Sequence, residues 1–275
     1  MPDLTEPLRY PALKGGINFR DFGGYDTVDG GRVTWGKLYR SGHLAGLTND
    51  CRATLDRLGI AAVCDFRTDH ENKSEPSNLP VHMRDGVLRL DIWPKAARSV
   101  GHMVKGMADG RYSDADIQQG QNAVYREFVT DFSDRYAAMF RHILAAGGRP
   151  VLIHCMVGKD RTGLGAALIQ AALGVPEDSI HADYELTNRS ETNIAYIRGI
   201  AERGAQVGGT DDPKAIEDLF QRFMATFGAR RDSLQAAFDA IRDMSGTIDA
   251  YFNDVLQIGP RERAQLREWF VKDKV

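Results

Sequence analysis

The segment between Val151 and Gly163 carries a thiol and a guanidinium in an order that suits attack on a phosphate. An apolar run ends in His154 and Cys155, five residues follow, and Arg161 then opens a helix-like stretch. A strand therefore delivers the thiol into a tight loop whose other end begins a helix. The backbone N–H groups of such a loop and the positive end of the helix form a cradle for an anion and favour the thiolate. Arg161 adds a planar fork that can hold two phosphate oxygens at once.

These residues predict covalent chemistry on a phosphate monoester. Cys155 is the predicted nucleophile, which attacks phosphorus to give a cysteinyl-phosphate intermediate. Arg161 is predicted to hold the equatorial oxygens and to stabilise charge in the transition state. The other loop positions are predicted to bind the substrate: His154, Met156, Val157, Gly158, Lys159, Thr162 and Gly163.

Three of these positions have an alternative role. Thr162 either hydrogen-bonds the sulfur as a leaving group or satisfies backbone groups at the helix start. His154 is expected to bond to the backbone of the loop and fix its shape, rather than to act directly. Lys159 is either a solvated lysine or a second positive group that contacts phosphate or a carboxylate.

The pattern His-Cys-x5-Arg-Thr-Gly resembles the signature loop of the cysteine-dependent protein tyrosine phosphatase superfamily. The Gly-Lys-Asp-Arg run at 158–161 is similar to a branch that includes bacterial phosphatases acting on phosphotyrosine and on phosphoinositides. Residues 18–25, 36–44, 65–68 and 183–188 resemble further blocks of the same family, so that the resemblance covers about residues 14–190. It implies a tyrosine or dual-specificity phosphatase that uses no cofactor and no metal. Its expected partner is a phosphorylated protein or a phosphoinositide.

The leaving oxygen needs a proton, so a carboxylic acid must lie close to it. Many members of the superfamily place this Asp after a Trp-Pro pair, but here Trp93-Pro94 is followed by Lys95. The resemblance makes Asp160 the leading candidate for the general acid, with Asp91 second. The alternative role for Asp160 is to tie the loop together.

Two further groups of residues have open roles. Arg20, Asp21, Asp65 and Arg67 lie in the matching blocks and are predicted to line or brace the site, or else to form structural ion pairs at strand ends. Cys64 is a candidate for a protective disulfide with the nucleophile. The main rival function is a phosphate-binding module without turnover. A second rival is another thiol enzyme, such as a sulfurtransferase or an oxyanion reductase.

The composition excludes several classes of protein. A net charge of −3 over 275 residues gives no general attraction to nucleic acid. No run of about eighteen apolar residues occurs, so integral membrane association is not expected. Cys51, Cys64 and Cys155 have no metal-ligand spacing and cannot all pair, which fits a reducing compartment. The start of the chain has no apolar signal core, so a cytoplasmic location is expected, with signal-independent export as the alternative.

Strands alternating with helices predict a single α/β phosphatase domain over residues 1–275, with a central, mainly parallel sheet flanked by helices. Strands are expected over 38–41, 60–66, 87–93 and 150–154, and helices over 48–58, 121–145 and 161–173. Beyond residue 190 the chain is expected to be helical, with a flexible connection over 203–212. Residues 190–250 are predicted to form a helical lid or subdomain, or else two helices that simply pack on the core. Residues 94–120 are predicted to be a mobile flap, either a solvated loop or a basic segment that meets an anionic substrate.

Overall fold

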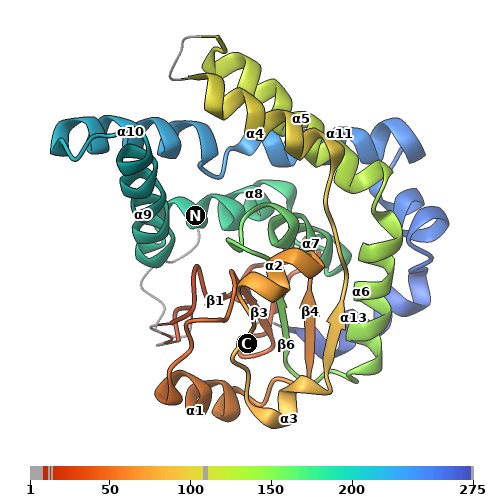
Figure 1. Ribbon diagram of the computed structural model, residues 1–275. Coiled ribbons are helices and arrows are strands. Elements are labelled where there is room, and N and C mark those ends of the chain that lie inside the picture. The colour runs from red at the N-terminus through yellow and green to blue at the C-terminus, as the bar shows by residue number, and fades with distance from the viewer. Residues whose placement is uncertain (1–8, 12, 14, 108–110, 274–275) are drawn as a thin grey trace.

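A five-stranded sheet forms the centre of the protein (Figure 1). The computed structural model describes residues 9–11, 13, 15–107 and 111–273. In spatial order, the strands of the sheet are β1 (Arg20–Asp21), β3 (Leu38–Ser41), β6 (Val151–His154), β4 (Ala62–Asp65) and β5 (Val87–Arg89). β1 is antiparallel to β3, and all the other neighbours are parallel. The predicted α/β fold with a mainly parallel sheet is therefore confirmed.

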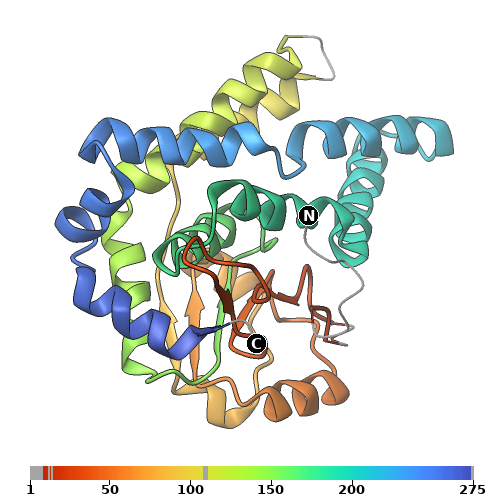
Figure 2. The ribbon, with the colours of Figure 1, turned by 180° about the vertical axis from the view of Figure 1, so that it is seen from behind.

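Helices surround this sheet. They are α1 (Asn49–Leu58), α2 (Asp69–Ser74), α3 (Val81–Arg84), α4 (Lys95–Met107), α5 (Asp114–Thr130), α6 (Ser133–Ala145), α7 (Asp160–Ala172), α8 (Glu177–Glu185), η1 (Leu186–Arg189), α9 (Glu191–Val207), α10 (Pro213–Phe227), α11 (Arg231–Ser245), α12 (Ile248–Ala250), η2 (Tyr251–Val255) and α13 (Pro260–Phe270). Figure 1 and the view from behind in Figure 2 show α4, α5, α10 and α11 above the end of the sheet where α2 and α7 lie. The loop between β6 and α7 is therefore covered by helices.

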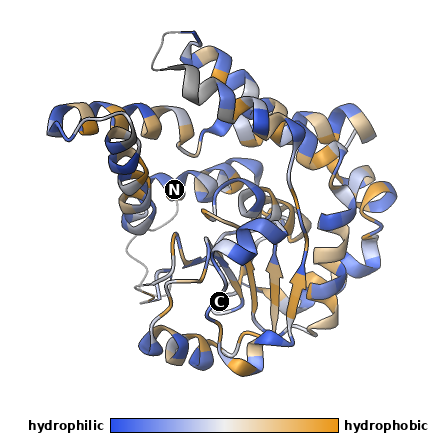
Figure 3. Cartoon of the chain, in the orientation of Figure 1, coloured by the Kyte–Doolittle hydropathy of each residue, from blue (hydrophilic) through white to orange (hydrophobic). Residues whose placement is uncertain are grey.

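The central strands bury both of their faces, which explains their continuous apolar runs. Cys64 and Ile153 belong to the larger hydrophobic core, which the strands share with α5, α6, α7 and α11. Val63 and Leu152 belong to a smaller core with α1 and α3. Figure 3 shows the hydrophobic colour concentrated on the strands of the sheet. Within the described residues, no helix is long and apolar enough to cross a membrane.

The elements predicted next to the loop are confirmed. β6 and α7 match the predicted strand over 150–154 and helix over 161–173 within a residue or two at each end. β3 has its predicted bounds, and β4 and β5 lie inside their predicted ranges. α1 begins after Thr48, whose side chain accepts the Cys51 N–H, and ends at Gly59 in the left-handed conformation. Local signals therefore sufficed for these elements.

The prediction of a mobile flap over residues 94–120 is wrong, because the helix α4 occupies residues 95–107. The start of this helix is capped from a distance: the Ala96 N–H donates to the carboxylate of Glu127 on α5, at 3.1 and 3.3 Å. A cap supplied from another helix leaves no local sequence signal. Two charged residues of this segment, Asp109 and the Lys105 side chain, lie outside the described part of the chain.

Three other boundaries differ from the prediction. The single helix expected over 121–145 is two helices, which break between Thr130 and Ser133 where Phe132 packs against the larger core. The connection expected over 203–212 is shorter, because α9 continues through Gly204. The region beyond 190 also contains a strand, β7 (Val271–Asp273), which pairs with β2 (Gly31–Val33).

α9 and α10 form a hairpin with a hydrophobic cluster of its own. Ile197 and Ala201 on α9 pack with Phe220 on α10, apart from the cores of the sheet. At the base of this hairpin, the Asn188 side chain donates to the Ala229 carbonyl at 2.9 Å and accepts the Ala229 N–H at 2.7 Å. α11 instead packs on α5 and belongs to the larger core. The predicted lid region therefore divides into a hairpin and a core helix.

Candidate active site

Cys155 lies directly after β6, the central strand of the sheet, and is 2% exposed. The carboxyl ends of parallel strands are where α/β folds bind ligands. The loop turns at Gly158, whose φ is +72°. A Cβ at this position would lie 2.5 Å from the Gly42 backbone nitrogen, so only glycine fits. The sequence therefore bends the loop tightly against the end of β3.

The carbonyl of Gly158 is held from outside the loop. It accepts hydrogen bonds from Asn18 Nδ2 at 2.9 Å and Arg40 Nη2 at 3.1 Å. The N–H of Lys159 belongs to the same peptide group as this carbonyl. Because the peptide is trans, this N–H points in the opposite direction, so fixing the carbonyl also fixes an N–H for an anion cradle. Arg40 Nη1 in turn donates to Asp183 Oδ2 at 2.7 Å, and Arg20 Nε lies 3.5 Å from Asp183 Oδ1. Burial alone would raise the pKa of Asp183, but the guanidinium groups of Arg20 and Arg40 bring it below its ordinary value.

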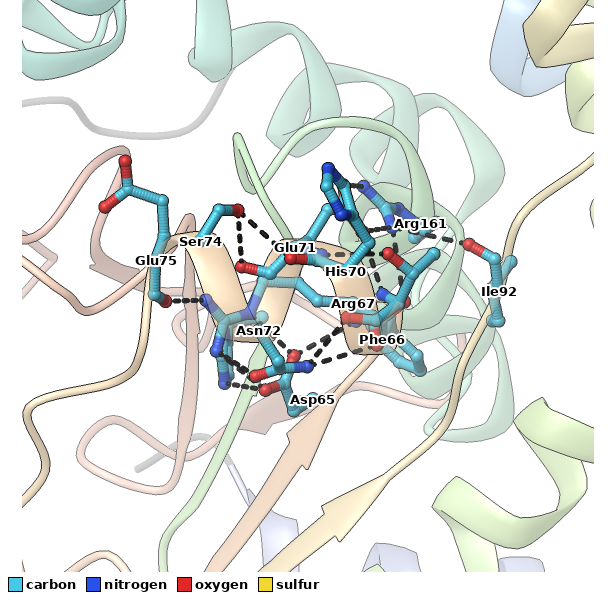
Figure 4. Close-up of polar contacts among 12 residues, drawn as sticks. Asp65, Phe66, Arg67, His70, Glu71, Asn72, Ser74, Glu75, Ile92 and Arg161 are labelled. Atoms are coloured by element: carbon cyan, nitrogen blue, oxygen red, sulfur yellow. Dashed lines mark hydrogen bonds and ion pairs between the residues drawn. The ribbon is translucent and has the colours of Figure 1, made fainter.

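Arg161, in the first turn of α7, is fixed by a carboxylate (Figure 4). Its Nη1 and Nη2 donate to Glu71 Oε2 and Oε1 at 2.7 and 2.8 Å. Nη1 also lies 3.3 Å from the carbonyls of Phe66 and Ile92, which follow β4 and β5. Burial opposes the charge of Arg161, but the bonds to Glu71 raise its pKa above the ordinary value. The guanidinium therefore stays charged and has one orientation.

Asp160 and Lys159 contact each other beside this arginine. Lys159 Nζ lies 3.2 Å from Asp160 Oδ1 and donates to the Phe227 carbonyl at the end of α10 at 2.6 Å. Asp160 Oδ1 also accepts a hydrogen bond from the Tyr125 hydroxyl at 3.0 Å. The Lys159 side chain is only 8% exposed, so the solvated-lysine alternative is wrong. Lys159 links the loop to the hairpin instead.

A cavity of about 440 Å³ adjoins the loop. Its walls come from α4, the loop, α9 and α10, and they are mostly apolar. The lining residues are Ala97, Val100, Val157, Lys159, Asp160, Asn193, Tyr196, Ile197, Ile200, Phe223 and Phe227. Asp160 is the one carboxylate in this lining among the described residues. The charged residues of this lining are Lys159 and Asp160, whereas Cys155 and Arg161 do not line the cavity.

The remaining loop residues have mixed outcomes. His154 is fully buried, with Nε2 3.7 Å from Asp65 Oδ2, and neither ring nitrogen forms a hydrogen bond of normal geometry with a described residue. The Cys155 backbone in the loop still acts as a hydrogen-bonding partner of His154, and it partly offsets the lowering of the imidazole pKa by burial. Thr162 Oγ1 is buried without a partner among the described residues. Met156 contributes its carbonyl, which accepts the His43 N–H at 2.9 Å.

Some of the supporting residues predicted from the sequence contact the loop, and others do not. Asp65 and Arg67 form a two-pronged ion pair with each other, at 2.9 and 2.8 Å, behind α2. Asp21 accepts the N–H groups of Gly23 and Gly36 at 2.7 and 2.5 Å. Asp21 and Arg67 form no hydrogen bond to the loop among the described residues, whereas Asp65 lies 3.7 Å from His154 of the loop and Arg20 braces the loop through Asp183. Asp91 is exposed and does not line the cavity.

The three cysteines are free thiols in this structure. Cys64 is fully buried on β4, in register with Ile153 of β6. Burial raises the pKa of the Cys64 thiol, which disfavours its thiolate. A disulfide between Cys64 and Cys155 therefore stays a prediction for oxidising conditions.

Comparison with known proteins agrees with this geometry. A model of the tyrosine phosphatase family matches residues 11–272. The chain belongs to the tyrosine phosphatase family. This tyrosine phosphatase is 32% identical over 252 residues to a Cupriavidus necator protein named a tyrosine-protein phosphatase, covering 91% of this chain and 84% of the relative. It is 32% identical over 268 residues to the triple specificity protein phosphatase PtpB of Mycobacterium tuberculosis, covering 88% of this chain and 92% of the relative. Among solved structures, TpbA of P. aeruginosa is similar with a TM-score of 0.32 and 21% identity, over 72% of this chain and 96% of that chain.

The resemblance predicted from the signature loop is thus confirmed, and the chain is an enzyme of the tyrosine or dual-specificity phosphatase kind. Sequence reasoning missed one prominent residue of this tyrosine phosphatase, Glu71. A signal was available, because Thr68 and Glu71 form a capping box at the start of α2. That pattern would have placed a carboxylate just beyond the end of β4. It would not have shown that Arg161 lies opposite.

Proposed function

We propose that this tyrosine phosphatase hydrolyses phosphate monoesters through a cysteinyl-phosphate intermediate. Cys155 is the nucleophile, Arg161 holds the phosphoryl oxygens, and Asp160 is the general acid. The observation that carries the proposal is the arrangement at the start of α7. There a buried thiol, a guanidinium fixed by Glu71 and the carboxylate that lines the cavity come from one short segment.

The proposed reaction has two steps. The thiolate of Cys155 attacks phosphorus, the bond from phosphorus to the ester oxygen breaks, and Asp160 gives its proton to that oxygen. Water then attacks the phosphocysteine, Asp160 takes a proton from this water, and the sulfur leaves as a thiolate. Arg161 stabilises the charge on the equatorial oxygens in both steps. The buried Thr162 hydroxyl is proposed to donate to the departing sulfur.

Asp160 is preferred over Asp91 as the acid on two grounds. Asp160 lines the cavity beside the loop, whereas Asp91 is exposed and outside the lining. The side chain of Asp160 is also held in place by two contacts, from Tyr125 and Lys159. A general acid must lie within hydrogen-bonding reach of the leaving oxygen, so position decides first.

The apolar walls of the cavity support substrates with a phosphate on an apolar body. We propose phosphotyrosine as the main class, with phosphoserine, phosphothreonine and phosphoinositides as further candidates. Phe223, Phe227 and Ile197 offer faces against which an aromatic ring or an acyl chain could pack. The mycobacterial relative is named a triple specificity protein phosphatase, which favours a broad range of substrates.

We propose that the α9–α10 hairpin is the lid over this site. It supplies one wall of the cavity and has a hydrophobic cluster separate from the main core. Elements with few contacts to the core open at low free-energy cost. Replacing residues 191–227 by a short linker should leave the thiol more open to alkylation and oxidants. Unchanged turnover and unchanged thiol reactivity in this variant would remove the lid from the proposal.

A substrate panel tests the proposed function. An aryl phosphate, an alkyl phosphate, phosphotyrosine and phosphoserine peptides and phosphoinositide vesicles are assayed for phosphate release by the native protein, Cys155→Ser, Asp160→Asn and Asp91→Asn. We expect no turnover by Cys155→Ser. Asp160→Asn should lose one limb of the pH–rate profile and spare aryl substrates with good leaving groups. If Asp91→Asn does this instead, the acid is Asp91, and if the native protein binds phosphotyrosine without releasing phosphate, the chain is a binding module.

A further inference from the structure

Two buried tyrosines connect helices α5 and α8 to Asp160. Tyr125 on α5 and Tyr184 on α8 are 0% and 1% exposed, and their hydroxyl oxygens lie 2.6 Å apart. The Tyr125 hydroxyl also lies 3.0 Å from Asp160 Oδ1. We propose that these two tyrosines are positioning residues that hold Asp160 in the orientation needed for proton transfer. The inference rests on the proposed function, in which Asp160 is the general acid.

The number of protons fixes the direction of these hydrogen bonds while Asp160 is ionised. A phenol carries a single proton, and a carboxylate can only accept. Tyr125 therefore donates to Asp160, and its own oxygen accepts the proton of Tyr184. Burial raises the pKa of both phenols well above the ordinary value, so both stay neutral. Neither tyrosine is then the source of the transferred proton.

Both contacts of the Asp160 carboxylate fall on one oxygen. Tyr125 and Lys159 each contact Oδ1, at 3.0 and 3.2 Å. Oδ2 forms no hydrogen bond with any residue that the structure describes, and the Asp160 side chain is 31% exposed toward the cavity that it lines. Oδ2 is therefore the atom free to carry a proton while Oδ1 remains an acceptor for Tyr125.

This assignment gives each proton transfer a defined atom. In the first step the Oδ2–H bond of Asp160 breaks, and the proton moves to the ester oxygen as that oxygen leaves phosphorus. In the second step Oδ2 takes a proton from the attacking water. Tyr125 continues to donate to Oδ1 in both protonation states, so no heavy atom has to move. The two tyrosines act only through Asp160.

The signature loop itself makes room for this arrangement. A Cβ on Gly163 would lie 2.9 Å from the ring of Tyr184, so the glycine lets this ring pack directly on α7. The rings of Tyr125 and Tyr184 meet edge to face, with centroids 6.1 Å apart at 76°. Phe128 packs in the same manner on Tyr125, with centroids 5.4 Å apart. Packing thus fixes both hydroxyl groups without help from solvent.

The test removes single hydroxyl groups and varies the leaving group. Tyr125→Phe and Tyr184→Phe are compared with Tyr251→Phe, a buried control whose hydroxyl bonds to the Val129 carbonyl at 3.4 Å. For an alkyl phosphate we expect kcat to fall about 10-fold in Tyr125→Phe and about 3-fold in Tyr184→Phe, because positioned acids contribute roughly 10²–10⁴-fold. For an aryl phosphate with a good leaving group we expect changes under about 2-fold. KM and inhibition by inorganic phosphate should not change, and Tyr251→Phe should match the native protein with both substrates.

A double variant separates positioning from general damage. Tyr125→Phe combined with Asp160→Asn should be no slower than Asp160→Asn alone, because the tyrosine acts only through Asp160. Equal losses for aryl and alkyl substrates, or additive losses in the double variant, would overturn the inference. If Tyr125→Phe does not fold, the same comparisons with Tyr184→Phe decide. If Asp160→Asn itself lacks the leaving-group dependence, the proposed function has failed; if only the tyrosine variants lack it, the positioning role alone has failed.

Discussion

Glu71 and Arg161 form a two-pronged ion pair, at 2.7 and 2.8 Å, that joins helix α2 to the first turn of α7. The carboxylate is itself fixed, because its Oε2 also accepts the Thr68 N–H at 2.8 Å in the capping box of α2. A short helix with a strong cap thus sets the direction of the guanidinium in the signature loop. Glu71 is not among the site residues predicted from the sequence.

We predict that Glu71→Gln weakens phosphate binding and slows turnover. The amide removes the charge that orients Arg161, and its N–H₂ opposes one of the guanidinium nitrogens. A lost charged hydrogen bond of about 1.5–3 kcal/mol corresponds to a fall of roughly 10–100-fold in kcat/KM. The measurement is kcat/KM for an aryl phosphate together with inhibition by inorganic phosphate. Glu75→Gln, at the C-cap of the same short helix but not bonded to Arg161, is the matched control and should change neither value.

Gly158 provides a prediction about the shape of the loop. A non-glycine residue in the left-handed region costs about 1–2 kcal/mol, and at this site the Cβ of alanine would also meet backbone atoms at 2.5 Å. Gly59 is the control, because its φ of +63° is similar but its Cβ would meet nothing within 4 Å. We expect both alanine variants to lose stability in urea unfolding, but only Gly158→Ala to lose most of its phosphatase activity. Full activity in Gly158→Ala would contradict the tight contact between the loop and the end of β3.

Lys159 should hold the hairpin against the loop. Its Nζ bonds to the Phe227 carbonyl at the end of α10, and a buried hydrogen bond from a charged group is worth about 1.5–3 kcal/mol. We expect Lys159→Met to lower the hydrogen-exchange protection of α9 and α10 by roughly 10-fold or more. α5 and α11 should keep their protection. Glu217→Gln, which removes the half-exposed ion pair with Arg198 within the hairpin but leaves Arg198 stacked on Phe220, is the control and should have a much smaller effect. Equal protection in both variants would refute the link.

We predict that the stability of the folded protein depends on pH through Asp21. Burial raises the pKa of this carboxyl to about 7, even though two backbone N–H groups partly offset the shift. The folded protein then binds more protons than the unfolded chain between about pH 4 and pH 7, so stability falls as the pH rises through this window. Three pKa units correspond to about 4 kcal/mol as an upper bound. Titration of the Asp21 carboxyl by NMR is the direct measurement, and a midpoint near 4 would disprove the prediction.

Removing the charge of Asp183 should destabilise the support behind the loop. Asp183→Asn leaves Arg20 and Arg40 buried without their shared carboxylate, and breaking a buried pair costs about 3–5 kcal/mol. Urea unfolding measures this loss. Asp243→Asn, which breaks an exposed pair with Arg126, is the control and should cost under about 1 kcal/mol. Similar losses in the two variants would mean that the buried cluster contributes no more than a surface pair.

Local signals in the sequence were enough for the elements that carry the nucleophile. The apolar run before Cys155 and the small apolar residues after Arg161 predicted β6 and α7, because burial on both faces leaves no polar alternation. The signature loop then indicated the chemistry. The ends of α1 also depend on local residues, because Thr48 caps its start and Gly59 its end.

Contacts between distant residues account for what the sequence did not reveal. α4 has a cap supplied by Glu127 of another helix, and Arg161 finds Glu71 only through the order of the strands. In the sequence, Lys159 cannot be distinguished from a solvated lysine, because its partner is the Phe227 carbonyl at the end of α10. In each case the partner is more than thirty positions away, so no local pattern could identify it.

The paired hydrogen bonds between Asn188 and Ala229 bear on how such enzymes diversify. They bring the two chain crossings at the foot of α9 and α10 next to each other, so the segment between them leaves and rejoins the catalytic body at one place. A segment attached in this way can be lengthened, shortened or exchanged without altering the path of the surrounding chain. Substrate preference in this architecture can therefore evolve by replacing one cassette while the residues that break the phosphate ester stay as they are.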